Sequence, residues 1–115
     1  MFPLLNQRQN QLGGSLSGGA QTILSIARGM IGRPRCLMLD EPSLGVAPVM
    51  VDLIFNIIRN LKKLQLTVLL VEQNATQAMD ISDRAYIMEV GQIVIEGTMD
   101  KILTDKQISD AYLGI

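Results

Sequence analysis

The residues best suited to chemistry form two short clusters, and the first of them is rich in glycine. Ser17-Gly18-Gly19 stands at the start of a segment with helical apolar spacing. Two glycines let a ligand approach the backbone, and the N–H groups and partial positive charge of a helix N-terminus favour phosphate oxygens. A serine-capped helix after a flexible turn has the same pattern, so the tripeptide alone indicates a phosphate site only weakly.

The second cluster is acidic. Asp40-Glu41-Pro42 closes the apolar run of residues 36–39. Carboxylates at the carboxyl end of a buried parallel strand lie where α/β sheets bind ligands. Asp40 is a candidate to hold Mg²⁺ through the ion's water shell, and Glu41 to orient or deprotonate a water molecule. An ordinary strand end with two solvated acids fits this pattern about equally well.

Apolar periodicity predicts the elements that position both clusters. It predicts helices over residues 17–31, 48–64, 75–79 and 99–113, and strands over 36–39, 66–71, 84–90 and 93–95. Ser17 is the expected N-cap of the first helix. The strands near Cys36 and Leu66 are apolar enough to need cover on both faces. The order predicts an α/β fold with a parallel sheet, flanking helices and a C-terminal antiparallel hairpin.

Composition excludes several classes of protein. The 115 residues include 10 Lys and Arg against 11 Asp and Glu, a formal charge of −1, and 48% are hydrophobic, which indicates a globular chain. Nucleic acid is not an expected partner, because the near-zero charge lacks the basic footprint that such binding requires. No histidine is present and Cys36 is the single cysteine, so the usual zinc clusters and Ser-His or Cys-His nucleophiles are excluded. Cys36 lies in an apolar run and is expected to be buried.

In their order along the chain these motifs resemble the ATP-binding subunits of ABC transporters. The segment 16–19 (LSGG) is similar to the signature motif, and the strand ending at Asp40 to the Walker B strand, with Glu41 as the catalytic glutamate. Ser43-Leu44-Gly45 resembles the D-loop, and Gln73 holds the switch position, where most members of the family have histidine. The segments 40–48 (DEPSLGVAP), 69–75 (LLVEQNA) and 111–115 (AYLGI) resemble the branched-chain amino acid importer subgroup.

The resemblance implies a P-loop NTPase-type fold, with ATP and Mg²⁺ bound between two nucleotide-binding domains. The implied partners are a second nucleotide-binding domain and transmembrane permease subunits, and the implied location is cytoplasmic, peripheral on the inner face of the cell membrane. The resemblance also implies a role for each site residue. Ser17, Gly18 and Gly19 would contact nucleotide in trans, and Ser43, Leu44 and Gly45 would form the D-loop. Asp40 would support Mg²⁺ through water, Glu41 would polarise the attacking water, and Gln73 would contact the γ-phosphate.

One absence limits this interpretation. No G-x-x-x-x-G-K-[ST] phosphate loop occurs in the sequence, so nothing in it would cradle the β- and γ-phosphates. We therefore expect the C-terminal part of one nucleotide-binding domain: a connector over 1–16, the signature helix to the switch segment over 17–83, and the hairpin and C-terminal helices over 84–115. The chain alone should bind ATP poorly and hydrolyse none. Ala20 also replaces the Gln or Glu usual at the fifth signature position.

Two other classes remain open at this point. The chain could be the C-terminal half of a nucleic-acid maintenance ATPase of the SMC or Rad50 type, where the signature and Walker B motifs also lie apart from the phosphate loop. It could instead be a non-catalytic interaction module that docks on a full-length subunit. If the chain is the C-terminal part of a nucleotide-binding domain, its apolar strands lack their neighbours and should leave unpaired edges and exposed apolar surface, which favours self-association. The subgroup resemblance alone implies leucine, isoleucine and valine as the transported substrates.

Overall fold

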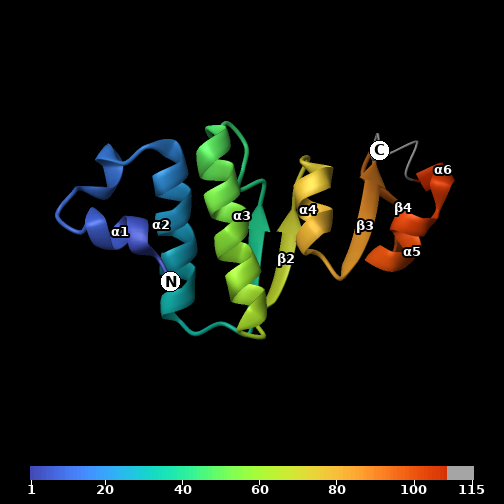
Figure 1. Cartoon of the computed structure of the whole chain (residues 1–115), viewed down its shortest axis with the longest axis horizontal. Coiled ribbons are helices and arrows are strands. Elements are labelled where there is room, and N and C mark those ends of the chain that lie inside the picture. The colour runs from blue at the N-terminus through green and yellow to red at the C-terminus, as the bar shows by residue number, and fades with distance from the viewer. Residues whose placement is uncertain (109–115) are drawn as a thin grey trace. The chain divides into compact units, whose positions relative to one another are not determined.

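The computed structural model describes residues 1–108 and divides the chain into two compact units. Met1–Gln73 forms the first unit, and the second begins at Asn74 (Figure 1). All the predicted site residues, from Ser17 to Gln73, lie in the first unit. The site can therefore be described within that unit alone.

The first unit alternates helices and strands. Its elements are α1 (Pro3–Gln7), the 3₁₀ turn η1 (Gly13–Ser15), α2 (Gly18–Ile31), β1 (Cys36–Asp40), α3 (Pro48–Lys63) and β2 (Thr67–Val71). The long helices and both strands begin and end within one residue of their predicted limits. The expected connector over 1–16 contains α1 and η1, and its one buried residue is Leu16, with 8% of its surface exposed.

Helices α2 and α3 lie side by side in Figure 1 and contact each other, and their buried residues form the core of this unit. Ile23 and Ile26 of α2 are buried, and α3 contributes Ile54, Ile58 and Leu61. These residues recur at three- and four-residue steps, so each helix turns one apolar stripe inward. Pro48 begins α3 at a position where its missing N–H leaves no hydrogen bond unmade.

Strands β1 and β2 are parallel neighbours, paired from Cys36 with Thr67 to Asp40 with Val71. Side chains alternate between half-buried and exposed along both strands. Leu37 is on the half-buried side, and its Cδ1 lies 3.1 Å from where a Cβ on Gly29 of α2 would stand. The helices therefore cover that face of the sheet.

The opposite face of the sheet corrects one expectation, the burial of Cys36. Cys36 is exposed rather than buried, and Met38 and Leu69 on the same side have 72% and 51% of their surface exposed. Apolar strands of this kind need cover on both faces, and without their neighbouring elements they are expected to leave apolar surface exposed, as Met38 and Leu69 do. Within Met1–Gln73 the helices cover only one face of this sheet, because α2 and α3 both pack on the half-buried side.

The second unit begins with a helix and continues as a hairpin followed by two short helices. Its elements are α4 (Ala75–Ile81), β3 (Arg84–Glu89), β4 (Gln92–Thr98), α5 (Met99–Thr104) and α6 (Lys106–Ile108). The antiparallel hairpin is confirmed. Its turn residues Val90 and Gly91 both have positive φ, +48° and +77°, as the tight turns of two-residue hairpin loops require.

The helical spacing over 99–113 begins with two short helices, α5 and α6, because the chain leaves helical geometry at Asp105. The Thr104 hydroxyl, at the end of α5, donates to the carbonyl of Asp100. Asp105, just before α6, accepts a hydrogen bond from the N–H of Ile108. A short polar side chain thus begins a new turn of helix. Residues 109–113 of that prediction, and AYLGI at 111–115, lie outside the described residues.

Among the residues that the structure describes, no helix has both the length and the apolar character needed to cross a membrane.

Candidate functional site

The N-terminus of α2 is built by Ser17, as predicted. Its Oγ accepts a hydrogen bond from the N–H of Ala20 at 3.4 Å, and its carbonyl accepts from the N–H of Gln21 at 2.8 Å. Gln21 Nε2 donates to the carbonyl of Leu16, which holds the entering chain against the first turn. Ser17 and Gly18 are exposed, so the positive end of the helix dipole faces solvent.

The two signature glycines have different surroundings. A Cβ added at Gly18 would meet nothing within 4 Å, so this position leaves the backbone open to a ligand. Gly19 is buried, and a Cβ there would stand 2.8 Å from Met50 Cβ and 3.0 Å from Val46 Cγ1. Glycine at position 19 is therefore required for close packing of α2 against the start of α3, a role that the sequence pattern did not indicate.

The acidic cluster continues β1 into a tight turn. Glu41 N–H donates to the Val71 carbonyl at 2.8 Å, which extends the ladder between β1 and β2 beyond Asp40. Glu41 then adopts a φ of +44°, in the left-handed region that costs a non-glycine residue about 1–2 kcal/mol. Leu44 N–H closes the turn by donating to the Glu41 carbonyl. A strained residue of this kind persists only where the surrounding structure holds it in place, and such residues are frequent at functional sites.

The structure joins Glu41 to Gln73 directly. Gln73 Nε2 donates to Glu41 Oε1 at 2.8 Å, although the two residues are 32 positions apart in the chain. The pair forms because β1 and β2 are adjacent parallel strands, so the residues that follow them meet at one edge of the sheet. A glutamine can donate here but cannot carry a charge or shuttle a proton.

A second contact spans the same edge, and sequence reasoning missed it. Glu72 Oε1 accepts from the backbone N–H of Ser43 at 2.9 Å, and both residues are half-buried. Glu72 directly follows β2, and an acidic residue at the end of the strand next to Asp40 was the signal that could have indicated it. Ser43 begins the predicted D-loop, in which Leu44 and Gly45 are exposed and Gly45 has a φ of +68°.

The glycine and acidic clusters lie toward the same end of the first unit. Gly29, near the end of α2, packs on β1 at Leu37, whereas Gly19 at the start of α2 packs on Val46 and Met50, which follow β1. The helix therefore runs opposite to the strand, with its N-terminus toward the carboxyl end of the sheet. That arrangement puts Gly18 and Glu41 on the side where α/β sheets bind ligands.

The donor set suits a cation held through water rather than a metal cage of side chains. Within residues 1–108 no group of three or more His, Cys, Asp or Glu side chains could hold a metal ion. Asp40 is an exposed carboxylate at the strand end, which suits Mg²⁺ held through water. The open backbone at Gly18 suits a phosphate oxygen.

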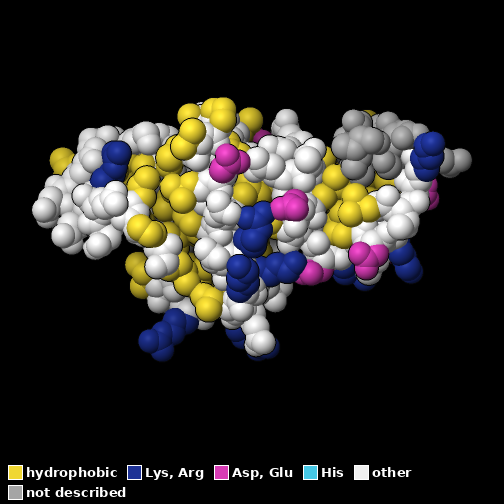
Figure 2. Space-filling view, viewed as in Figure 1, with side chains coloured by type: hydrophobic (Ala, Val, Ile, Leu, Met, Phe, Trp, Pro, Cys, Tyr) yellow, Lys and Arg dark blue, Asp and Glu magenta, His cyan; other side chains and the backbone are white. Residues whose placement is uncertain are grey.

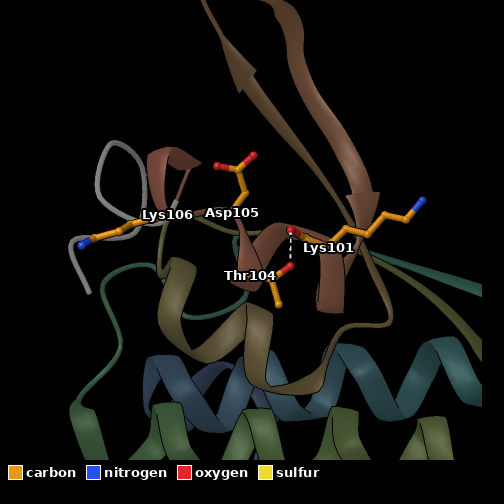
Figure 3. Close-up of a pocket in the computed structure, with 4 residues that line it drawn as sticks. All are labelled: Lys101, Thr104, Asp105 and Lys106. Carbon is orange, nitrogen blue, oxygen red and sulfur yellow. Dashed lines mark hydrogen bonds between the residues drawn. The ribbon is translucent and has the colours of Figure 1, made fainter.

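A shallow depression in the second unit contains none of these residues. Lys101, Thr104, Asp105 and Lys106 line it. Their side chains point in different directions, and the Thr104 hydroxyl is hydrogen-bonded to the Lys101 carbonyl of its own helix (Figure 3). Because no polar groups converge there, we do not regard it as a second site.

Comparison with known proteins finds similar sequences among the ATP-binding proteins of transport systems. A sequence model of the ABC transporter family matches residues 1–44. The high-affinity branched-chain amino acid transport ATP-binding protein BraG of Pseudomonas aeruginosa is 48% identical over 99% of this chain and 49% of its own length. The lipopolysaccharide export ATP-binding protein LptB of Haemophilus influenzae is 38% identical over 98% of this chain and 46% of its own length.

A solved structure supports the same assignment. An ATP-binding cassette of an ABC transporter, in its ADP conformation, is 33% identical and superimposes with a TM-score of 0.70 over 89% of this chain and 42% of its own length. The chain spans about half the length of the curated relatives it matches. Sequence and fold agree, and the chain belongs to the family of ABC transporter ATP-binding proteins.

Proposed function

We propose that this chain supplies the signature, Walker B, D-loop and switch segments of an ATP site that energises import of branched-chain or related amino acids. The observation that carries the proposal is the 2.8 Å hydrogen bond from Gln73 to Glu41, which joins the expected switch residue to the expected catalytic glutamate. The identity to BraG, itself named for branched-chain amino acid transport, supports the choice of substrate class.

In this proposal the site works by positioning and charge. Glu41 accepts a proton from the attacking water, and Gln73 keeps one of its carboxylate oxygens in a fixed direction. Ser17, Gly18 and Gly19 present the α2 N-terminus to nucleotide held by a partner domain, and Ser43, Leu44 and Gly45 reach toward that partner. Mg²⁺, held through water at Asp40, would neutralise charge on the transferred phosphoryl group.

Other parts of the site must come from elsewhere. The chain has no phosphate loop, so we propose that it acts as the C-terminal part of a nucleotide-binding domain and that it hydrolyses no ATP by itself. A second nucleotide-binding domain would complete the site across the dimer, and transmembrane permease subunits would receive the resulting motion on the cytoplasmic side of the membrane.

A hybrid protein tests the function. In this BraG hybrid, the present chain replaces the matching residues of BraG. We expect the BraG hybrid to hydrolyse ATP within about tenfold of BraG itself, and Glu41→Gln to remove at least about 99% of that activity, because the general base is lost. The 115-residue chain alone should show none. A folded hybrid without activity, beside active BraG, would contradict the proposal.

The LptB relatives favour a second candidate, in which the parent ATPase energises lipopolysaccharide export. Transport assays separate the two, because the hybrid should restore branched-chain amino acid uptake to a strain that lacks BraG only under the first proposal. A non-catalytic docking module predicts a hybrid that assembles but does not hydrolyse ATP. An SMC or Rad50 type of ATPase predicts tight, salt-dependent binding to duplex DNA.

A further inference from the structure

The turn that follows β1 has a backbone group that the turn itself does not satisfy. Glu41 N–H bonds to Val71, Leu44 N–H bonds to Glu41, and Val46 N–H bonds to Ser43. The Ser43 N–H lies between these and donates instead to a side chain, Glu72 Oε1, at 2.9 Å. Because Ser43 is half-buried, loss of that acceptor would leave its amide poorly solvated.

We infer that Glu72 is a positioning residue that fixes Glu41 and the D-loop for catalysis. This inference rests on the proposed function, since it assigns a role in the same ATP site. Glu72 does not need to touch nucleotide. It acts through Ser43, two residues beyond Glu41, by keeping the intervening turn in one conformation.

The geometry makes this role specific. Glu41 occupies a strained backbone conformation, at a φ of +44°, which persists only while its surroundings hold it. Three hydrogen bonds from the end of β2 provide that hold: Val71 accepts from the Glu41 N–H, Gln73 donates to the Glu41 carboxylate, and Glu72 accepts from Ser43. Three consecutive residues, 71–73, thus hold the backbone and side chain of Glu41 and the backbone of Ser43 at the start of the D-loop.

The three contacts also connect two segments with different expected tasks. The switch segment would contact the γ-phosphate through Gln73, whereas the D-loop would face the partner domain through Leu44 and Gly45. The carboxylate of Glu72 links the switch segment, to which Glu72 belongs, to the backbone of the D-loop at Ser43. Rotation of the switch segment would therefore move Ser43, and displacement of the D-loop would move the residue next to Gln73.

Hydrogen exchange at the Ser43 amide tests the tether without any nucleotide. In the 115-residue chain and in the BraG hybrid, Glu72→Ala should speed exchange at this amide about tenfold or more, because a hydrogen bond to a carboxylate is lost. Glu72→Gln keeps an acceptor oxygen of the same reach and should stay within about threefold of the parent. Glu96→Ala, which removes an exposed carboxylate from β4, is the matched control and should change nothing at Ser43.

ATP hydrolysis by the BraG hybrid tests the catalytic role. Glu72→Ala should lower kcat about tenfold or more and leave KM for ATP within about twofold, because misplacement of a catalytic group affects the chemical step more than ground-state binding. Glu72→Gln should restore most of kcat. Unchanged Ser43 exchange in Glu72→Ala, or altered exchange with unchanged kcat, would overturn the inference. An inactive parent hybrid would instead overturn the proposed function, and the positioning role with it.

Discussion

At the scale of single residues, the pair of Glu41 and Gln73 differs from the family's usual pair, because glutamine does not titrate as histidine does. Gln73 donates to Glu41 in the place where most ABC ATPases have histidine, and the chain contains no histidine at all. A glutamine donates the same hydrogen bond at every pH, whereas an imidazole gains a charge near pH 6.5. Orientation of Glu41 by its switch residue should therefore be insensitive to pH in this protein.

Gln73→His should make the activity of the BraG hybrid sensitive to pH. Below about pH 6.5 the imidazolium would stabilise the Glu41 carboxylate and make it a weaker base, so activity should fall as pH is lowered through that value. The parent hybrid, measured beside it between pH 5.5 and 8.5, should lack this fall. Superimposable pH profiles for the two proteins would show that residue 73 does not interact with Glu41, the proposed general base, during hydrolysis.

At the scale of elements, glycine has two separate uses at the start of α2. Gly18 leaves the helix end open, whereas Gly19 lets Met50 and Val46 approach the helix backbone. The first use can be read from a glycine pair before a helical pattern. The second cannot, because it depends on how α3 packs against α2 in three dimensions.

Paired alanine substitutions separate these uses. Gly19→Ala would put its Cβ 2.8 Å from Met50 Cβ, so we expect the free energy of unfolding of the BraG hybrid to fall by about 1–3 kcal/mol. Gly18→Ala meets nothing and should change it by about 0.5 kcal/mol or less. Urea denaturation followed by circular dichroism measures both. Equal effects of the two substitutions would refute the packing role of Gly19.

The same contrast explains which elements could be predicted from sequence. Apolar periodicity located α2, α3, β1 and β2, because each has an inward stripe or a short apolar run of its own. The position of the break between α5 and α6 could not be predicted, since helical spacing continues across Asp105 and a capping side chain decides the outcome locally. Glu72 was missed for another reason: its partner, Ser43, is 29 residues away and becomes a neighbour only through the pairing of β1 with β2.

At the scale of the molecule, the first unit has more apolar surface than its own elements can cover. Met38, Leu69 and Val71 project from the sheet face opposite the helices, and each has at least half of its surface exposed. Figure 2 also shows apolar side chains exposed over α2 and α3. In these helices Ile31 and Val49 each have 80% of their surface exposed. Exposed apolar surface of this extent is typical of an interface.

Self-association of the 115-residue chain should follow from the uncovered sheet face. We expect light scattering to show oligomers, whereas a double variant, Met38→Gln with Leu69→Gln, should shift the distribution toward monomer because it removes apolar area without touching the α2–α3 core. A parent chain that stays monomeric at high concentration would contradict this.

Cys36 offers a direct measure of what covers that face in a longer protein. It is the single cysteine of the chain, it is exposed, and it points to the same side of the sheet as Met38. In the double variant, alkylation of Cys36 should approach the rate of an unprotected thiol. In the BraG hybrid we expect alkylation of Cys36 to be at least about tenfold slower, because apolar strands of α/β sheets are covered on both faces in complete domains. Mass spectrometry of the peptide that contains Cys36 measures this rate. Equal rates would mean that the BraG portion leaves this face open, and that the apolar residues on it serve a different partner.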